Sequence, residues 1–314
     1  QSLRKSKKEL SIFLLKRGLW LIVAEVVLVS LGISFDLSWT FIFLQVIWAI
    51  GCSMIILGLL IRTNYLAILI VGIVLFFGHN LTNYINFTPN SISAGVAGVI
   101  MTTRGAFLPI DSTHAIGAFY AILPWTGIML LGYCTGRLFE ITYPVIKRRK
   151  SLLGIGLAMV FLFILLRITN VYGNPEPWDG RTIFSFLDTS KYPPSLQYSC
   201  MTLGPALILM SFLETSRMGW TKVVSIYGKV PFFYYILHFY LLHLVLIVLF
   251  FITGHTTAQI TEANNIFWFR PINFGYGLAI VYTIWIGVVA ILYLPSRWYT
   301  RYKSTNQHWW LKYI

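Results

Sequence analysis

The chain has 314 residues, of which 57% are hydrophobic and only 11% are charged, and its mean hydropathy is +0.73. Soluble domains carry roughly 25% charged residues, so this composition excludes a soluble globular protein. The formal charge of +14 indicates membrane topology and contact with anionic lipid, and it does not indicate a nucleic-acid partner. The three cysteines lie in or beside apolar runs, which makes a disulfide framework a poor interpretation.

Eight apolar runs approach the ~20 residues that a helix needs to cross the hydrocarbon core of a bilayer. They are continuous and do not alternate, which excludes a closed barrel. The runs are residues 18–34, 39–61, 65–85, 116–133, 152–168, 196–213, 230–252 and 274–294. The sequence therefore predicts an all-α, polytopic transmembrane helix bundle. We expect one integral membrane domain over 1–314, with a basic lead-in at 1–17, the bundle at 18–294 and a basic, aromatic tail at 295–314.

Basic residues are divided unequally between the two sides of these eight spans. If the connections alternate across the membrane, 19 of the 24 Lys and Arg lie on the side that holds both termini. The other five are Arg104, Arg167, Arg181, Lys191 and Arg270. Because basic loops are retained in the cytoplasm, both visible termini are predicted to be cytoplasmic. The protein is then an integral protein of a plasma membrane.

Three connections on the outer side are long, at residues 86–115, 169–195 and 253–273. Within the first, residues 91–101 are apolar but too short to cross, so we expect a re-entrant or interfacial segment. Loops longer than about 15 residues are usually functional or disordered. The Trp, Tyr, Pro and charged residues of these loops favour ordered, functional structure.

Polar side chains inside the apolar spans are candidates for function, because burying them in a bilayer is costly. Glu25 lies halfway along the first span, and Gln45 lies in the second. Glu25 could serve as a proton-relay or substrate carboxylate. Alternatively, it is protonated or hydrogen-bonded to a neighbouring helix. The Gly132-x-x-x-Gly136 pattern is typical of close helix packing.

His79 and Asn80 are adjacent at the outer end of the third span. An imidazole can take a proton from an acceptor, and a carboxamide can hold an oxyanion. The pair is therefore a candidate catalytic site. The alternative interpretation is a helix-end cap beside an interfacial histidine.

His238 and His243 lie in the seventh span but are five residues apart, about 140° around a helix, so they do not share a face well. A metal pair would be four apart, and no carboxylate completes a site, so no metal is expected. Tyr234 and His238 do share a face and could line an internal cavity. Interhelical hydrogen bonding explains them equally well.

The outer loops carry a second group of candidates. Trp178 could stack on a sugar ring, and Asp179, Lys191 and Tyr192 offer charge and hydrogen bonds to an acceptor. A structured loop without a ligand is the alternative. In the other outer segment, Asp111 and His114 lie near Arg104, which makes them further candidates for substrate binding.

Short strings between residues 12 and 245 occur in an order that resembles one family. They are LKRGLW (15–20), followed by Glu25, then FLQVIWAIG (43–51), FGHN (77–80), PWTG (124–127), KYPPS (191–195), MTLGP (201–205) and VPFFY (230–234). Together they resemble bacterial multi-span membrane proteins related to heparan-α-glucosaminide N-acetyltransferase. The chain opens at Gln1 with a lead-in that resembles a connection. We therefore expect a further amino-terminal segment in the natural protein.

The resemblance implies a membrane-embedded acyltransferase. It would pass an acyl group, acetyl in the first instance, from cytosolic acyl-CoA to a sugar or glycan on the far side of the membrane. The family's catalytic histidine and its companion asparagine lie upstream of where this chain begins, so neither is assigned to a residue here. The catalytic roles of His79 and Asn80 come from their chemistry alone. Tyr234 and His238 would line the path of the acyl-CoA donor.

The other predicted partners are membrane lipid and the sugar acceptor, and the sequence leaves a homo-oligomer open. An alternative function is a proton-coupled transporter or flippase of a sugar or lipid-linked substrate, in which Glu25 and the buried histidines would couple proton movement. Transporters often contain two halves with matching broken helices. No convincing pair is present in this sequence.

Overall fold

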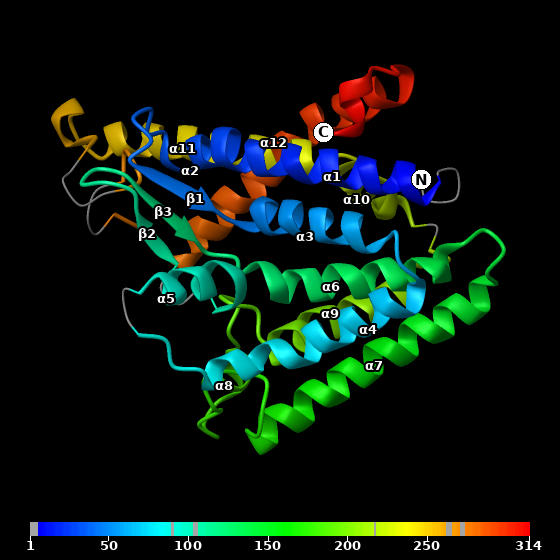
Figure 1. The fold of residues 1–314 in the computed structure, drawn as a ribbon. Coiled ribbons are helices and arrows are strands. Elements are labelled where there is room, and N and C mark those ends of the chain that lie inside the picture. The colour runs from blue at the N-terminus through cyan, green and yellow to red at the C-terminus, as the bar shows by residue number, and fades with distance from the viewer. Residues whose placement is uncertain (1–5, 89–90, 103–105, 217, 262–265, 271–273) are drawn as a thin grey trace. The chain divides into compact units, whose positions relative to one another are not determined.

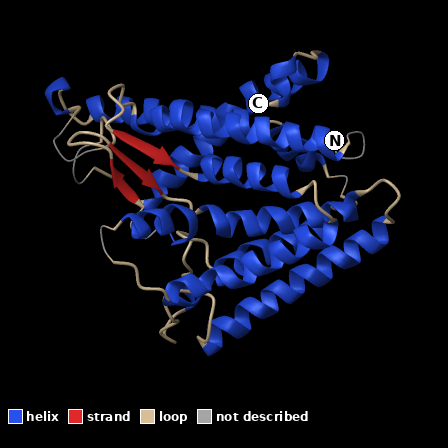
Figure 2. Cartoon of the chain, viewed as in Figure 1, coloured by secondary structure: helices blue, strands red, loops and turns tan. Residues whose placement is uncertain are grey.

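The computed structural model describes residues 6–88, 91–102, 106–216, 218–261, 266–270 and 274–314. It is mostly helical with three short strands (Figures 1 and 2). The chain divides into two compact units. Unit 1 comprises Gln1–Val23, Leu44–Leu108 and Ile116–Ser216, and unit 2 comprises Ala24–Phe43, Pro109–Ala115 and Arg217–Ile314. The single membrane domain expected for 1–314 stays a prediction.

Unit 1 contains the helices that run from most of α1 to α9. They are α1 (Lys7–Ala24), α3 (Val46–Leu60), α4 (Tyr65–Gly78), η3 (His79–Tyr84), α5 (Ile92–Ala97), η4 (Gly98–Thr102), α6 (Ile122–Thr135), η5 (Gly136–Phe139), α7 (Val145–Thr169), α8 (Ile183–Leu187) and α9 (Leu196–Leu213). Local sequence fixes several of the ends. The Asn64 side chain accepts a hydrogen bond from the Ala67 N–H at the start of α4, and Ser195 caps α9 in the same way.

Unit 2 contains a short helical segment and the carboxyl-terminal helices. They are η2 (Glu25–Val29), α2 (Ser30–Ser34), α10 (Gly219–Lys229), α11 (Pro231–Ile252), η6 (Thr257–Gln259), α12 (Leu278–Thr305) and η7 (Trp309–Lys312). Within this unit α11 packs against α2, α10 and α12. The segment η2 is a π-helix, a form that is frequently found at functional sites.

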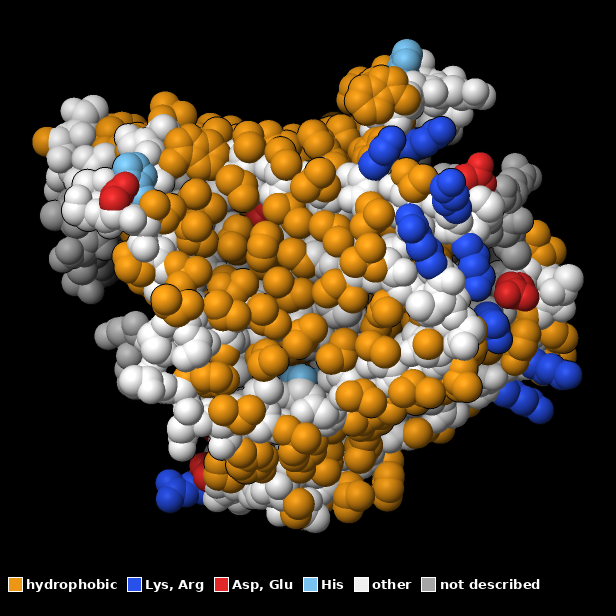
Figure 3. Space-filling model, in the orientation of Figure 1, with side chains coloured by type: hydrophobic (Ala, Val, Ile, Leu, Met, Phe, Trp, Pro, Cys, Tyr) orange, Lys and Arg blue, Asp and Glu red, His pale blue; other side chains and the backbone are white. Residues whose placement is uncertain are grey.

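Five of the expected spans are helices long and apolar enough to cross a membrane. They are Tyr65–Tyr84, Val145–Thr169, Leu196–Leu213, Pro231–Ile252 and Leu278–Thr305. Hydrophobic side chains cover most of the face in view in Figure 3, as a surface in contact with lipid requires. The expected span at 18–34 corresponds to the helical run formed by α1, η2 and α2. The count of eight and the orientation of the termini stay predictions.

Two expected helical spans, 39–61 and 116–133, are wrong at their amino-terminal ends, where the chain forms strands. Strand β1 (Phe41–Leu44) precedes α3, and β3 (Ala115–Ala118) precedes α6. With β2 (Phe107–Pro109) they make a three-stranded sheet in the order β1-β3-β2. Its hydrogen bonds include Phe119 N–H to the Leu44 carbonyl and Ala118 N–H to the Ala106 carbonyl, both 3.0 Å. A four-residue apolar segment such as β1 or β3 is compatible with both strand and helix. Hydrogen bonding to distant residues therefore decided that these segments are strands.

Close helix packing in unit 1 depends on two pairs of glycines. A Cβ on Gly18 would lie 2.6 Å from the Gly51 carbonyl oxygen, and one on Gly156 would lie 2.8 Å from the Gly204 carbonyl oxygen. These contacts bring α1 against α3 and α7 against α9, as small residues do in membrane helices. The expectation for Gly132 and Gly136 is wrong, because a Cβ on either meets nothing within 4 Å.

Candidate functional site

His79 and Asn80 are buried at the junction of α4 and η3. The Asn80 Oδ1 accepts a hydrogen bond from the backbone N–H of Leu196 at 2.8 Å. His79 Nδ1 lies 2.9 Å from the Leu75 carbonyl oxygen, and its Nε2 lies 2.8 Å from the Pro194 carbonyl oxygen. A neutral imidazole carries one N–H, so it donates to only one of these two carbonyls at a time.

These contacts fasten η3 to the turn that precedes α9. In that turn Lys191 and Pro194 form an isolated antiparallel bridge. Both ring nitrogens of His79 lie against backbone oxygens, so proton exchange with a substrate requires Nε2 to leave Pro194. The catalytic roles of His79 and Asn80 stay predictions.

The same turn carries Lys191 and Tyr192, which lie beside two aromatic residues of unit 1. Lys191 Nζ is 5.0 Å from the ring centroid of Tyr192 and 5.9 Å from that of Tyr120. The Tyr120 and Tyr192 hydroxyls are 3.4 Å apart, and the Tyr120 ring lies 5.4 Å from that of Trp125. We call Lys191, Tyr192, Tyr120 and Trp125 the Lys191 cluster. It combines a cation with aromatic faces, which suits a sugar or an anionic group.

Sequence reasoning missed two members of this cluster. Tyr120 lies two residues before α6 and Trp125 lies in its first turn. The run was interpreted as a membrane span, and Trp125 was used only as part of a string that carries the family resemblance. The buried Trp125 Nε1 has no hydrogen-bond partner, and an indole N–H usually has one when it is buried. The string PWTG at residues 124–127 was the available signal.

Arg167 organises the loop that follows α7. Its side chain is 2% exposed, and its guanidinium donates to four backbone carbonyls, those of Glu176, Ser185, Phe186 and Asp188, at 2.6–3.0 Å. This residue was counted among the outer cations but was not singled out. A lone arginine at the end of an apolar span was the signal that could have identified it.

Two of the predicted acceptor contacts, Trp178 and Asp179, lie in this loop. The Trp178 ring packs edge-on against Phe186 at 5.0 Å, and its buried Nε1 has no hydrogen-bond partner. Asp179 is exposed and accepts hydrogen bonds from the Ser185 hydroxyl at 2.6 Å and the Arg181 N–H at 3.0 Å. These hydrogen bonds, that of Ser185 foremost, hold the pKa of Asp179 below its ordinary value. Trp178 is therefore held against the loop, and Asp179 is an exposed, charged carboxylate.

Asp111 and His114 belong to unit 2. Their exposed side chains are in contact, with His114 Nδ1 2.8 Å from Asp111 Oδ2. Hydrogen bonds from Thr113, above all from its backbone N–H, hold the pKa of Asp111 well below its usual range. Arg104, which was expected near them, lies outside the described residues.

Two further histidines of unit 2, His238 and His243, lie on α11. The Tyr234 and His238 rings are stacked with centroids 5.9 Å apart, as their spacing predicts. His243 is buried, stacks on Phe35 at 4.0 Å and places Nδ1 3.0 Å from the Ile33 carbonyl oxygen, whereas its Nε2 has no partner. Roles for these side chains in acyl-CoA binding or proton movement stay predictions.

Glu25 and Gln45 occupy different kinds of site. Glu25 is fully buried and is the first residue of η2. In the same segment, the Leu28 carbonyl accepts a hydrogen bond from the Tyr240 hydroxyl at 2.9 Å. Gln45 is only partly buried and forms the N-cap of α3. Among the described residues, no three His, Cys, Asp or Glu side chains lie close enough together to hold a metal ion.

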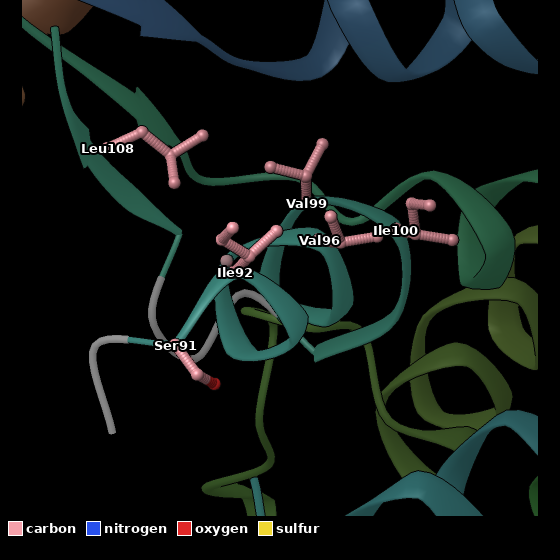
Figure 4. Close-up of a pocket in the computed structure, with 7 residues that line it drawn as sticks. Ser91, Ile92, Val96, Val99, Ile100 and Leu108 are labelled. Carbon is pink, nitrogen blue, oxygen red and sulfur yellow. The ribbon is translucent and has the colours of Figure 1, made fainter. Parts of the chain in front are cut away.

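Three cavities among the described residues of unit 1 bear on the site. The smallest, about 450 Å³, is apolar and is lined by α5, η4 and Leu108 (Figure 4). It lies in the segment that was expected to be re-entrant or interfacial. A second cavity of about 750 Å³ lies between α1, α3, α4 and α6 and has both polar and apolar walls. A third, of about 610 Å³, lies between α4, α6, α7 and α9.

Comparison with known proteins gave one match. The family model described as heparan-alpha-glucosaminide N-acetyltransferase, catalytic, matches residues 2–170, just over half of the chain. The match covers α1 to α7, and therefore includes His79, Tyr120 and Trp125. No curated protein and no solved structure matches the chain.

Proposed function

Because the chain belongs to the heparan-α-glucosaminide N-acetyltransferase catalytic family, we propose that it transfers an acyl group from cytosolic acyl-CoA to a sugar or glycan across the membrane. The family is one of transmembrane acetyltransferases, and acetyl-CoA is the proposed donor. The excess of Lys and Arg on one side of the predicted spans supports the cytosolic side as the donor side. The acceptor would meet the protein at the opposite face.

One observation carries this proposal. The turn at residues 191–194 joins the buried His79 to Lys191 and Tyr192, because the Pro194 carbonyl lies 2.8 Å from His79 Nε2. The His79 imidazole therefore contacts the same short turn that carries Lys191 and Tyr192, the proposed contacts of the acceptor. An acceptor that binds at Lys191 and displaces Pro194 would come within reach of the ring.

The reaction needs few groups. His79 takes the proton from the acceptor hydroxyl or amine as that atom attacks the acyl carbon, and the Asn80 amide N–H groups stabilise the oxyanion. The carbon–sulfur bond then breaks, and the proton leaves with the coenzyme A thiol. Lys191 and Tyr192 hold the acceptor, with Trp178 and Asp179 in the neighbouring loop. Tyr234 and His238 are the proposed contacts of the donor.

The test is transfer by the purified full-length natural protein. It is incubated with acetyl-labelled acetyl-CoA and a panel of amino sugars and neutral sugars. We expect labelled sugar from the wild type, a fall in kcat on the order of 100-fold or more for His79→Gln, and a raised acceptor KM for Lys191→Met. His308→Gln, on an exposed histidine of the tail, is the matched control. The absence of both transfer and acyl-CoA binding would refute the proposal.

A second function is favoured by one observation in unit 2, the full burial of Glu25 in a π-helical segment. A buried carboxylate of this kind suits a proton-coupled transporter or flippase. Uptake of labelled sugar into vesicles under a pH gradient separates the two. Equal uptake by the wild type and Glu25→Gln would argue against proton coupling, whereas its loss in Glu25→Gln would favour transport.

A further inference from the structure

The cavity between α4, α6, α7 and α9 is an apolar channel with a single cation in its wall. Its described lining residues are Tyr65, Leu69, Phe76, Phe77, Ile128, Leu131, Gly132, Cys134, Thr135, Arg137, Leu138, Ile155, Met159, Leu203 and Leu207, and of these only Arg137 is charged. The wall follows α4 from Tyr65 to Phe77, which is about 18 Å at the rise of a helix. Three of its four helices are among the candidate spans, so the cavity is walled mainly by helices long and apolar enough to cross a membrane.

Arg137 stands at one end of this cavity. It belongs to η5, directly after α6, and its Cζ lies 3.4 Å from the centroid of the Tyr65 ring. The side chain is exposed, and among the described residues no carboxylate lies within salt-bridge distance of it. Stacking on Tyr65 therefore orients the guanidinium, while its N–H donors remain available to an anion.

Arg137 and Tyr65 also line the second cavity, the one between α1, α3, α4 and α6, whose walls are partly polar. There Arg137 and Tyr65 are joined by Lys7, Asn64 and Glu140 among others. Lys7 already donates to the Thr63 carbonyl at 2.8 Å. The two cations exceed the one carboxylate, so this side of Arg137 is positive. An amphiphile with an apolar chain and an anionic head matches the change from apolar to positive walls.

We propose that this place binds an anionic phospholipid, with one acyl chain in the α4–α6–α7–α9 cavity and the phosphate against Arg137. A guanidinium pairs with phosphate through two parallel N–H donors, and the nearby Lys7 favours a net negative head over a zwitterionic one. The site does not use His79 or the Lys191 cluster. Lipid binding is measured without turnover, so its outcome is independent of the proposed acyl transfer.

Gly132 allows the chain-binding part to be tested alone. It lines the cavity, and a Cβ there meets nothing within 4 Å. Gly132→Leu therefore adds an apolar side chain in the cavity wall without a clash of its Cβ. Gly154→Leu is the matched control, because Gly154 is likewise in a long helix with nothing within 4 Å but does not line the cavity.

The experiment is native mass spectrometry of the purified chain with phosphatidylglycerol and phosphatidylcholine of identical acyl chains. We expect the wild type to prefer phosphatidylglycerol, and Arg137→Gln to lower that affinity on the order of tenfold while leaving phosphatidylcholine unchanged. Gly132→Leu should weaken both lipids, and Gly154→Leu neither. Thermal unfolding of each variant checks that it is folded.

Three outcomes would overturn the proposal. One is equal affinity of the wild type for the two lipids. Another is wild-type binding of both lipids by Gly132→Leu, which decides the matter even if Arg137→Gln does not fold. The third is a long-chain acyl-CoA that binds in an Arg137-dependent manner and is not displaced by phosphatidylglycerol, because the occupant would then be a coenzyme A ester.

Discussion

Replacing Arg167 with Met should release the loop that follows α7. The guanidinium is buried and holds four backbone carbonyls between residues 176 and 188. Methionine keeps an unbranched apolar stem of similar reach but removes every donor. The loop carries Trp178 and Asp179, so its release would also remove two proposed acceptor contacts from their positions.

The expected loss is about 3 kcal/mol of local stability. Each hydrogen bond to a charged group contributes about 1.5–3 kcal/mol, but the four contributions are not additive, because the freed carbonyls are hydrated when the loop opens. Removing one partner from a buried charged network costs about 3–5 kcal/mol, and we take the lower end. That value increases the opening constant of the loop about 100-fold.

Hydrogen exchange measured by mass spectrometry on peptides from residues 170–190 tests this value. Exchange that follows the opening equilibrium should be about 100-fold faster in Arg167→Met. Arg167→Lys, which keeps the charge but loses the fork of donors, should lie between. Arg181→Met, at an exposed arginine of the same loop, is the control. Unchanged exchange in Arg167→Met, or equal acceleration in Arg181→Met, would refute the reasoning.

Three further predictions concern two substitutions and one titration. Gly156→Val should lower the unfolding temperature by an amount equivalent to about 1–3 kcal/mol, because its Cβ would meet a carbonyl oxygen of α9 at 2.8 Å; Gly154→Val should not. Ser195→Ala should cost about 1 kcal/mol in chemical unfolding, because it removes the N-cap of α9; an unchanged midpoint would contradict this. The backbone N–H of Thr113 leads the hydrogen bonds that depress the pKa of Asp111. The stabilisation of the turn by the Asp111 carboxylate is therefore complete above the ordinary carboxyl pKa of about 3.9. It is lost as the pH falls through the lowered pKa of Asp111. A carboxyl NMR titration of Asp111 with an ordinary midpoint would disprove that.

The candidate site was only partly visible in the sequence. Lys191 and Tyr192 were identified because a loop with Tyr, Pro and charge is unusual beside apolar spans. Their neighbours Tyr120 and Trp125 were not identified as site residues, because the sequence of an apolar run does not show whether an aromatic residue at its start faces lipid or a binding site. His79 was identified by its chemistry, but its contact with Pro194 joins residues 115 positions apart. No local pattern reports a contact at that separation.

The sequence by itself determined that this is a membrane protein of mostly helical structure, and it indicated the family that the match over residues 2–170 confirmed. Long apolar runs suffice for this, because a bilayer requires every backbone group of a span to be satisfied within its own helix. The tertiary structure alone decided that Phe41–Leu44 is a strand, that Gly156 and Gly204 bring two helices together while Gly132 lines a cavity, and that Arg167 holds a loop. Each of these outcomes depends on which distant residue completes a hydrogen bond or fills a space, and periodicity along the chain carries no record of that partner.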